Sequence, residues 1–300
     1  MKKIYSKVNT IPKGQASGRL IDGCLALEGG AFRGLYTQGF LDALMIQDIN
    51  LSCVIGISAG ALSGVNYVSG QIGRSGRINL TYRHDSRYVG LKALLHSHSP
   101  LDISFLIEER GIIKEKLDEE RFYRPQQRFI AVTTNELTGE TVYFEKGKCT
   151  DILKAVQASA TMPIISPPVM IDGVPYFDGG CSCNFPYQWA MEQGYRKILV
   201  IRTRELSYRK EVKESKLSLR MYQKYPAFAR KLADRDFIYN QDCDDVERLH
   251  NEGRLLLLAP SQPVTVTRLE KDMEKLGDLY WLGYQDCLDR LEEIKTYLKK

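Results

Sequence analysis

Histidine, closely spaced cysteine and long apolar runs are all scarce in this sequence of 300 residues. No stretch approaches the ~18 consecutive apolar residues that are typical of a membrane-spanning helix. The lysines near the N-terminus precede no apolar segment of the kind found in secretory signals. The seven cysteines are scattered and lack the dense spacing of a disulfide-stabilised domain. We therefore expect a cytoplasmic protein, and peripheral contact with the inner face of a membrane is a further hypothesis.

Neither a metal site nor a nucleic-acid site is favoured by the composition. Cys181 and Cys183 form a Cys-x-Cys pair, but no second pair or nearby histidine supplies the four ligands usual for zinc. The net charge of +5 is too small to indicate a nucleic-acid partner by itself, although it suits contact with anionic lipid. We expect no metal, no cofactor and no nucleic-acid partner.

Strand-like and helix-like patterns alternate in the first two-thirds of the chain. Residues 24–27 form a short apolar run, 34–47 have helical spacing, 53–55 form a second apolar run and 61–68 again suit a helix. This alternation predicts an α/β fold with a mostly parallel sheet flanked by helices. Further strands are expected at 128–134, 141–144, 169–171, 174–177, 197–201 and 255–258.

The composition of the sequence changes after Arg202. Residues 202–242 carry eleven basic and six acidic side chains interleaved with aromatic ones, and 268–298 have a helical pattern with one apolar face. We expect an N-terminal extension at 1–21, a main α/β domain at 22–202 and a mainly helical C-terminal subdomain at 203–300. Aromatic side chains that pack inward explain the stretch 202–242 best, and contact with a membrane surface or a nucleic acid is the alternative.

Gly56-Ile57-Ser58-Ala59-Gly60 has the form G-x-S-x-G between an expected strand and an expected helix. A serine on such a tight turn is forced outward, and the N-terminus of the following helix favours a developing negative charge. A plain Gly/Ser turn is the alternative, but the strand-turn-helix context favours a nucleophile at Ser58.

Two other glycine-rich turns carry chemistry of the same kind. Gly29-Gly30-Ala31-Phe32-Arg33-Gly34 lies between a strand and a helix, where its backbone N–H groups can hold an oxyanion. It lacks the glycine and lysine spacing of a nucleotide-binding loop. Asp178-Gly179-Gly180 ends an expected hairpin and offers a carboxylate that can accept the proton of a serine. Taken alone, an Asp-Gly pair most often marks an ordinary turn.

Together, these three motifs resemble the patatin-like phospholipase family, whose pattern is a glycine-rich loop with a basic residue, then G-x-S-x-G, then D-G-[GA], in this order. Ala158-Ser159-Ala160 followed by Pro163 also resembles a family segment. The likeness covers about residues 22–202, and bacterial members with a helical C-terminal extension are the most similar. Ala31 departs from the usual third glycine, so its methyl group is expected to narrow the loop while its N–H stays available.

The resemblance implies a three-layer patatin-like fold and a Ser–Asp dyad that hydrolyses carboxylic esters of lipids. On this hypothesis Ser58 attacks the ester carbonyl, Asp178 takes its proton, and Gly29, Gly30 and Ala31 hold the oxyanion. Arg33 and Ala59 are candidate substrate-binding residues, and a surface position on a helix is the alternative for Arg33. The expected partner is a lipid or another ester.

Two alternatives stay open. An esterase of the α/β-hydrolase type orders its triad Ser, Asp, His, and only His250 follows Asp178 in this chain. The charged segment around His250 is typical of a helix end, which disfavours the triad. The second alternative is a lipid-binding protein that keeps the fold without activity.

Overall fold

One central sheet organises the computed structural model, which describes residues 3–98, 102–103, 105, 115–213 and 216–299. Its strands are β2 (Ile21–Leu27), β3 (Leu51–Ile57), β5 (Arg128–Asn135), β6 (Thr141–Glu145), β7 (Val169–Ile171), β8 (Val174–Asp178), β9 (Ile198–Ile201) and β10 (Leu256–Leu258). The order is β10-β9-β2-β3-β5-β8-β7, and β6 also pairs with β5. Neighbours from β10 to β5 run parallel, whereas β6, β7 and β8 pair antiparallel. The expected mostly parallel sheet is confirmed.

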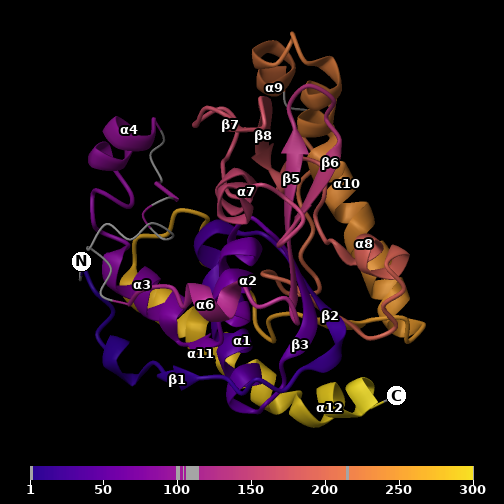
Figure 1. Cartoon of the computed structure of the whole chain (residues 1–300). Helices are drawn as coiled ribbons and strands as arrows, with labels where there is room; N and C mark the ends of the chain where they lie inside the picture. The colour runs from indigo at the N-terminus through magenta and orange to yellow at the C-terminus, as the bar shows by residue number, and fades with distance from the viewer. Residues whose placement is uncertain (1–2, 99–101, 104, 106–114, 214–215, 300) are drawn as a thin grey trace.

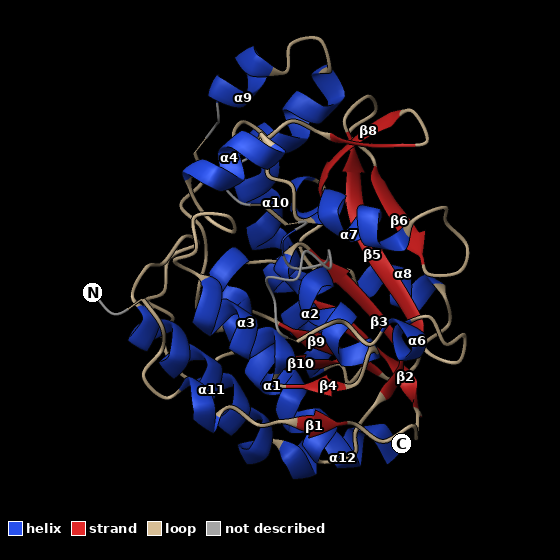
Figure 2. Ribbon diagram, turned by 60° about the vertical axis from the view of Figure 1, so that its left-hand side comes forward, coloured by secondary structure: helices blue, strands red, loops and turns tan. Residues whose placement is uncertain are grey.

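Helices cover both faces of this sheet and form the outer layers (Figures 1 and 2). They are α1 (Gly34–Ile46), α2 (Ala59–Val68), α3 (Arg74–Tyr82), α4 (Leu91–Ser97), α6 (Glu119–Phe122), α7 (Ile152–Ser159), α8 (Tyr187–Glu192), α9 (Lys216–Met221), α10 (Pro226–Asn251), α11 (Met273–Asp289) and α12 (Leu291–Lys299). A separate two-stranded sheet pairs β1 (Gly14–Gln15) with β4 (Gln71–Ile72). Short 3-10 turns lie at Val8–Thr10, Ala31–Arg33 and Gly179–Cys181.

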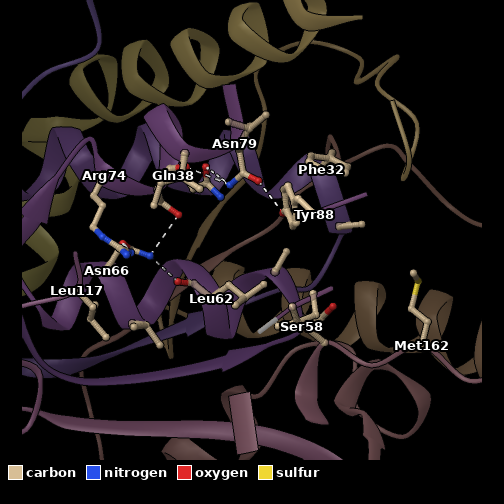
Figure 3. A pocket seen from close by; sticks show the side chains of 18 residues that line it. Phe32, Gln38, Ser58, Leu62, Asn66, Arg74, Asn79, Tyr88, Leu117 and Met162 are labelled. Atoms are coloured by element: carbon tan, nitrogen blue, oxygen red, sulfur yellow. Dashed lines mark hydrogen bonds between the residues drawn. The ribbon is translucent and has the colours of Figure 1, made fainter. Parts of the chain in front are cut away.

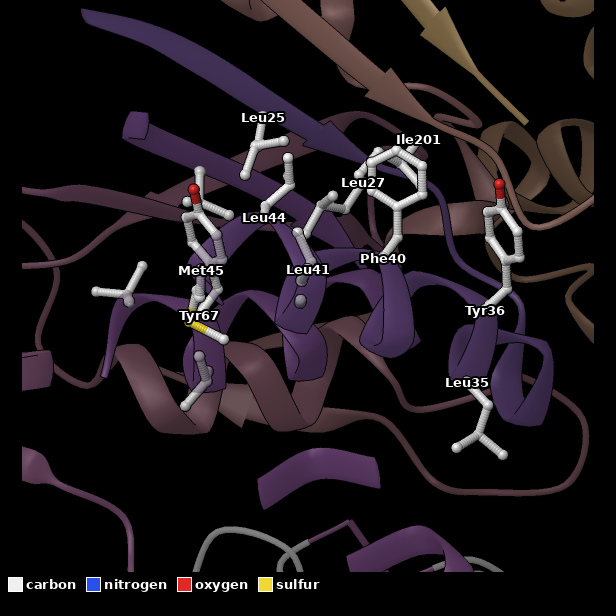
Figure 4. Close-up of a cluster of buried hydrophobic side chains, with 14 of the residues drawn as sticks. Leu25, Leu27, Leu35, Tyr36, Phe40, Leu41, Leu44, Met45, Tyr67 and Ile201 are labelled. Atoms are coloured by element: carbon white, nitrogen blue, oxygen red, sulfur yellow. The ribbon is translucent and has the colours of Figure 1, made fainter. Parts of the chain in front are cut away.

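The alternation of side chains along β2 divides the core into two halves. Leu25 and Leu27 point into the half that contains α1, α2, α7 and α11, and Figure 4 shows them facing residues of α1 such as Phe40. Cys24 and Ala26 point into the other half, against α8 and α10. A strand buried on both faces carries a continuous apolar run rather than an alternating one, as the sequence of β2 does.

The C-terminal third shares the sheet and the core of the preceding residues. Strand β10 extends the sheet by pairing with β9, and α11 packs along α1. Helix α11 starts where the Asp272 carboxylate accepts hydrogen bonds from the N–H groups of Glu274 and Lys275. It ends at Asp289, so the helical pattern expected over 268–298 is divided between α11 and α12. Residues on both sides of Arg202 therefore contribute to the same sheet and the same buried cluster, and the domain boundaries stay a prediction.

Two glycines allow α1 and α11 to pack closely. A Cβ atom at Gly39 would overlap the backbone carbonyl of Tyr280, and one at Gly283 would overlap that of Tyr36. Backbone cannot move aside as a flexible side chain can, so these positions exclude any larger residue. At the same contact, the buried Tyr280 hydroxyl donates a 2.7 Å hydrogen bond to Asp42.

The strand order also determines where loops converge. The chain passes from β2 to β3 and β5 on one side, and later places β9 and β10 on the other side of β2. Such a reversal of direction opens a crevice at the carboxyl ends of the parallel strands, where ligands of α/β proteins bind. Among the described helices, none is both long and apolar enough to cross a membrane.

We predict that Gly283→Ala destabilises the protein by roughly 2–4 kcal/mol, because the added methyl group forces the two helix backbones apart. Equilibrium unfolding in urea measures the change. The matched control is Gly18→Ala, since a Cβ atom at this exposed glycine meets nothing within 4 Å. Equal stability of the two variants would show that the α1–α11 contact tolerates separation.

Candidate active site

Ser58 occupies the sharp turn between β3 and α2. Its backbone has φ 55° and ψ −121°, a positive φ that is unfavourable for a residue with a side chain. The Ser58 N–H donates a 2.9 Å hydrogen bond to the Ser159 hydroxyl at the end of α7. The strained turn is thus held by a neighbouring element, and the strand-turn-helix context expected for Ser58 is confirmed.

The turns that follow β2 and β3 lie against each other. A Cβ atom at Gly29 would be 3.0 Å from the Cβ atom of Ser58, and one at Gly60 would be 2.6 Å from the carbonyl oxygen of Leu27. The distance at Gly60 is too short for a real side chain, and the one at Gly29 would require the neighbouring atoms to shift. The glycines of the two motifs therefore let the two loops approach across adjacent parallel strands.

The glycine-rich loop exposes backbone donors beside Ser58. Within the described part of the chain, the backbone N–H groups of Gly30 and Ala31 donate no hydrogen bond to a protein acceptor. The next N–H group, that of Phe32, donates to the Arg268 carbonyl at 3.2 Å. Ala31 has φ 49°, a left-handed conformation that costs an alanine roughly 1–2 kcal/mol. The family's usual glycine would avoid this cost, and the amide direction is the same for either residue.

Glu28 anchors this loop from within the protein. Its buried carboxylate accepts hydrogen bonds from the N–H and hydroxyl of Thr203 and a 3.0 Å bond from the Tyr239 hydroxyl. Thr203 also donates a 3.1 Å bond to the Gly29 carbonyl. Segments after β9 and within α10 thereby fix the loop that follows β2. Our sequence analysis missed all three residues, and the only local signal was an acidic residue directly after an apolar strand.

Asp178 ends β8 and faces the same space as Ser58. Its carboxylate accepts a 2.7 Å hydrogen bond from Gly180 N–H, and its backbone N–H is bound to the Thr161 carbonyl at 2.8 Å. The Thr134 hydroxyl donates to its carbonyl oxygen at 3.0 Å. The carboxylate, the backbone N–H and the carbonyl oxygen of Asp178 are thus each held by a hydrogen bond.

The environment of Asp178 makes its carboxylate more basic than usual. Burial raises the pKa of Asp178 to about 6, while hydrogen bonds from Gly180 and Ser58 and the charges of Arg268 and Arg235 act in the opposite direction. The side chain is only 9% exposed. At neutral pH this carboxyl is mainly ionised, and it is a stronger base than an exposed aspartate.

An apolar pocket opens on one side of Ser58. Figure 3 shows Ser58 near one end and Arg74 and Leu117 near the other. The lining is mostly apolar and includes Ala31, Phe32, Leu35, Ala59, Leu62, Val65, Ile78 and Met162. Polar side chains at the far end are satisfied by one another, as in the 2.8 Å hydrogen bond from Arg74 to Asn66. The pocket suits an extended apolar group.

A wider polar cleft of about 690 Å³ opens on the other side of Ser58. Gly29, Gly30, Ala31, Arg33 and Asp178 all line it together with Ser58. The structure therefore brings the predicted catalytic and oxyanion residues to one place. Arg33 is buried rather than solvated on a helix surface, being 8% exposed. Ala59 lies in the apolar pocket instead.

The residue required by the alternative triad lies elsewhere. His250, in the last turn of α10, accepts a 3.4 Å hydrogen bond from Leu257 N–H through Nδ1. It lines neither the pocket nor the cleft, and no other histidine does so in the described ranges. Within those same ranges, no group of three or more His, Cys, Asp and Glu side chains is arranged to hold a metal ion.

Comparison with known sequences agrees with the motifs. Residues 25–191 match the family model described as patatin-like phospholipase, and residues 225–299 match one described as a domain of unknown function (DUF6363). The uncharacterized protein YjjU of Escherichia coli (strain K12) is 26% identical over 183 residues, which are 60% of this chain and 51% of that protein. The probable lipid hydrolase 463L of Invertebrate iridescent virus 6 is 29% identical over 189 residues, 58% of this chain and 64% of that protein. The matched part thus spans about half to two-thirds of these relatives.

The structural comparison concerns the fold alone. The crystal structure of VipD from Legionella pneumophila superposes with a TM-score of 0.50, covering 98% of this chain and 71% of that one at 16% identity. The shared fold is the α/β arrangement described above. Because the patatin-like match takes in more than half of the residues, the chain belongs to the patatin-like phospholipase family.

Proposed function

We propose that this protein is a serine hydrolase that cleaves carboxylic ester bonds of lipids, with Ser58 as nucleophile and Asp178 as general base. The observation that carries the proposal is the position of Ser58, which lines both the apolar pocket and the polar cleft that contains Asp178. Membership of the patatin-like family and the likeness to a probable lipid hydrolase support it.

The chemistry follows from groups that surround Ser58. The ionised Asp178 accepts the Ser58 proton as the oxygen attacks the ester carbonyl, and the N–H groups of Gly29, Gly30 and Ala31 stabilise the resulting oxyanion. When this tetrahedral adduct collapses, the proton on Asp178 passes to the leaving alcohol and an acyl-serine forms. Asp178 then takes a proton from water as the water oxygen attacks the acyl carbon. The second tetrahedral adduct breaks its bond to Ser58 Oγ, which receives the proton from Asp178, and the carboxylic acid is released.

The two hollows beside Ser58 suit the two parts of a lipid ester. The apolar walls of the pocket, such as Leu62 and Val65, favour the acyl chain because its burial removes apolar surface from water. The polar cleft accommodates the alcohol portion. Two exposed isoleucines at the cleft, Ile164 and Ile165, are 41% and 42% exposed, and they suit peripheral contact with a lipid surface.

We expect Ser58→Ala and Asp178→Ala to lower kcat for p-nitrophenyl esters by roughly 10³-fold or more, because each removes a group that bonds or protonates the reacting atoms. His250→Ala is the matched test of a triad and retains most of the activity. Circular dichroism verifies that each variant is folded. Loss of activity in His250→Ala comparable to that in Ser58→Ala would instead support the α/β-hydrolase alternative.

A fluorophosphonate separates an enzyme from an inactive lipid-binding protein. Wild type is expected to be labelled at Ser58, and Ser58→Ala to give no label at that peptide. Absence of label and of ester turnover in wild type would favour the binding protein.

We expect Leu62→Phe to shorten the acyl chains that the enzyme accepts, because the larger ring fills part of the apolar pocket. The ratio of kcat/KM for a long-chain p-nitrophenyl ester to that for the butyrate should fall at least about tenfold, within the range that one or two buried methylene groups supply. Leu91→Phe, at an exposed leucine, is the control. An unchanged ratio in Leu62→Phe would place the acyl chain outside this pocket.

We expect Asp178→Asn to be more stable than wild type at pH 8 by about 3 kcal/mol, because the raised pKa means that ionised Asp178 opposes folding. Its pKa rises from 3.8 to about 6 on folding. Between these two pKa values the native protein therefore binds more protons than the unfolded chain. The free energy of unfolding of wild type falls as the pH rises through this range. The difference between the variants should vanish below pH 4. Urea unfolding measures it, with exposed Asp22→Asn as control. Equal stability at every pH would contradict the raised pKa.

A further inference from the structure

Both the patatin-like part and the C-terminal third of the chain line the polar cleft beside Ser58. The lining includes the glycine loop, Ser58, Asp178 and five basic side chains. These are Arg33 from the glycine loop and Arg204, Lys210, Arg235 and Arg268 from the C-terminal third. Two of the five share one carboxylate, and the other three have no ion-pair partner in the described part of the chain.

Lys210 and Arg235 share the carboxylate of Asp236. The distances to its Oδ1 atom are 3.2 Å from Lys210 Nζ and 3.7 Å from Arg235 Nε. Of the other acidic residues at the cleft, Glu211 is paired with Lys213 at 2.7 Å. The Glu28 carboxylate is occupied by Thr203 and Tyr239. The charge of Glu28 still attracts Arg33, but in the described part of the chain no acidic side chain at the cleft forms an ion pair with Arg33, Arg204 or Arg268.

Arg33 and Arg204 carry buried donors without acceptors. The Nε atoms of both are buried and have no hydrogen-bond partner in the described part of the chain. The Arg33 side chain as a whole is more than nine-tenths buried. Arg204 lies 4.5 Å from the centre of the Tyr208 ring and donates through Nη1 to the Val264 carbonyl. Unpaired buried guanidinium donors are costly, but these two Nε atoms are too enclosed to meet a ligand, so contact with an anion in the cleft falls to the outer nitrogens of the two guanidinium groups.

Arg268 and Arg204 both add positive charge near Arg33. Burial lowers the pKa of Arg33, and the charges of Arg204 and Arg268 lower it further against the opposing effect of Glu28. Arg268 keeps exposed surface, yet loss of water around it is also the main cause of its lowered pKa. The walls of the cleft therefore limit the access of water to the Arg268 guanidinium group, although part of the residue is exposed to solvent. An anion entering the cleft would relieve the repulsion.

The arginines are fixed relative to the reacting groups. The Arg268 carbonyl accepts the Phe32 N–H at 3.2 Å, which joins its segment to the glycine loop. Thr203, directly before Arg204, is bound to both Glu28 and Gly29. The backbone that carries Arg204 and Arg268 is therefore held next to the glycine loop.

We propose that Arg33, Arg204 and Arg268 form a subsite for the phosphate group of an anionic acylglycerol substrate, so that the C-terminal third selects the headgroup. This inference rests on the proposed lipid hydrolase function. Guanidinium groups bind phosphate oxygens through paired, charge-assisted hydrogen bonds. Five basic and four acidic side chains line the cleft, and this excess of one positive charge disfavours the cationic choline group. The subsite therefore favours a phosphate without a compensating cation.

The selectivity test uses lysophosphatidic acid, lysophosphatidylcholine and monoacylglycerol with the same short acyl chain, each below its micelle concentration. Wild type should have a kcat/KM for lysophosphatidic acid at least about tenfold above that for lysophosphatidylcholine. Arg268→Gln should lower this ratio at least about tenfold, the value of one charge-assisted hydrogen bond pair, and Arg268→Lys should restore part of it. Arg230→Gln, at an exposed arginine of α10 outside the cleft, should leave it unchanged. Equal rates on the two phospholipids, or faster cleavage of the choline lipid, would overturn the proposal.

A binding measurement tests the subsite separately from catalysis. Calorimetry on Ser58→Ala protein should detect glycerol phosphate, and adding Arg268→Gln should weaken its affinity at least about tenfold. If inorganic phosphate binds but glycerol phosphate does not, the headgroup assignment is wrong and the site takes free phosphate. If wild type hydrolyses no ester, the proposed function fails, and calorimetry alone then decides whether the anion subsite exists.

Discussion

The close approach of the turns after β2 and β3 is the constraint on which the candidate site depends. Adjacent parallel strands bring these turns side by side, and the lack of side chains at Gly29 and Gly60 lets their backbones come within contact distance. The glycine-rich loop thus lies against the turn that carries the serine. A side chain at either glycine would crowd the facing loop, and the proposed role of the loop amides in holding the oxyanion depends on this proximity.

A buried carboxylate extends this constraint to the C-terminal third. Glu28 follows β2 directly, and its partners Thr203 and Tyr239 come from beyond β9 and from α10. Breaking one partner would leave an uncompensated buried charge, which is more costly than losing an exposed ion pair. The glycine loop is thus fixed by residues that lie outside the patatin-like match at 25–191. This coupling gives the C-terminal third a structural role as well as the proposed role in headgroup selection.

Sequence patterns predicted the parts of the fold that depend on local order. The apolar runs of β2 and β3, the turn at Ser58 and the hairpin ending at Asp178 each have a signal within about ten residues, so their positions were foreseen. Contacts between distant segments had no such signal. Gly39 in α1 looks like an ordinary helical glycine until α11 is packed on it, and Arg204 and Arg268 are far apart in sequence although both line the cleft. The end of α11 was missed because Leu291, Ile294 and Leu298 continue the apolar face of the pattern, although the backbone breaks between α11 and α12.

An aspartate can replace histidine as base only if its proton affinity is raised without leaving it protonated at neutral pH. Burial provides the increase at Asp178, and the nearby charges of Arg268 and Arg235 limit it. The proposed headgroup subsite uses one of these same arginines. A phosphate bound to Arg268 would offset its positive charge, which removes part of the influence that stabilises ionised Asp178. Substrate binding would then raise the basicity of the carboxylate beside Ser58, and a lipid without the anionic group would leave it weaker. The same cation would in this way contribute to both binding and proton transfer.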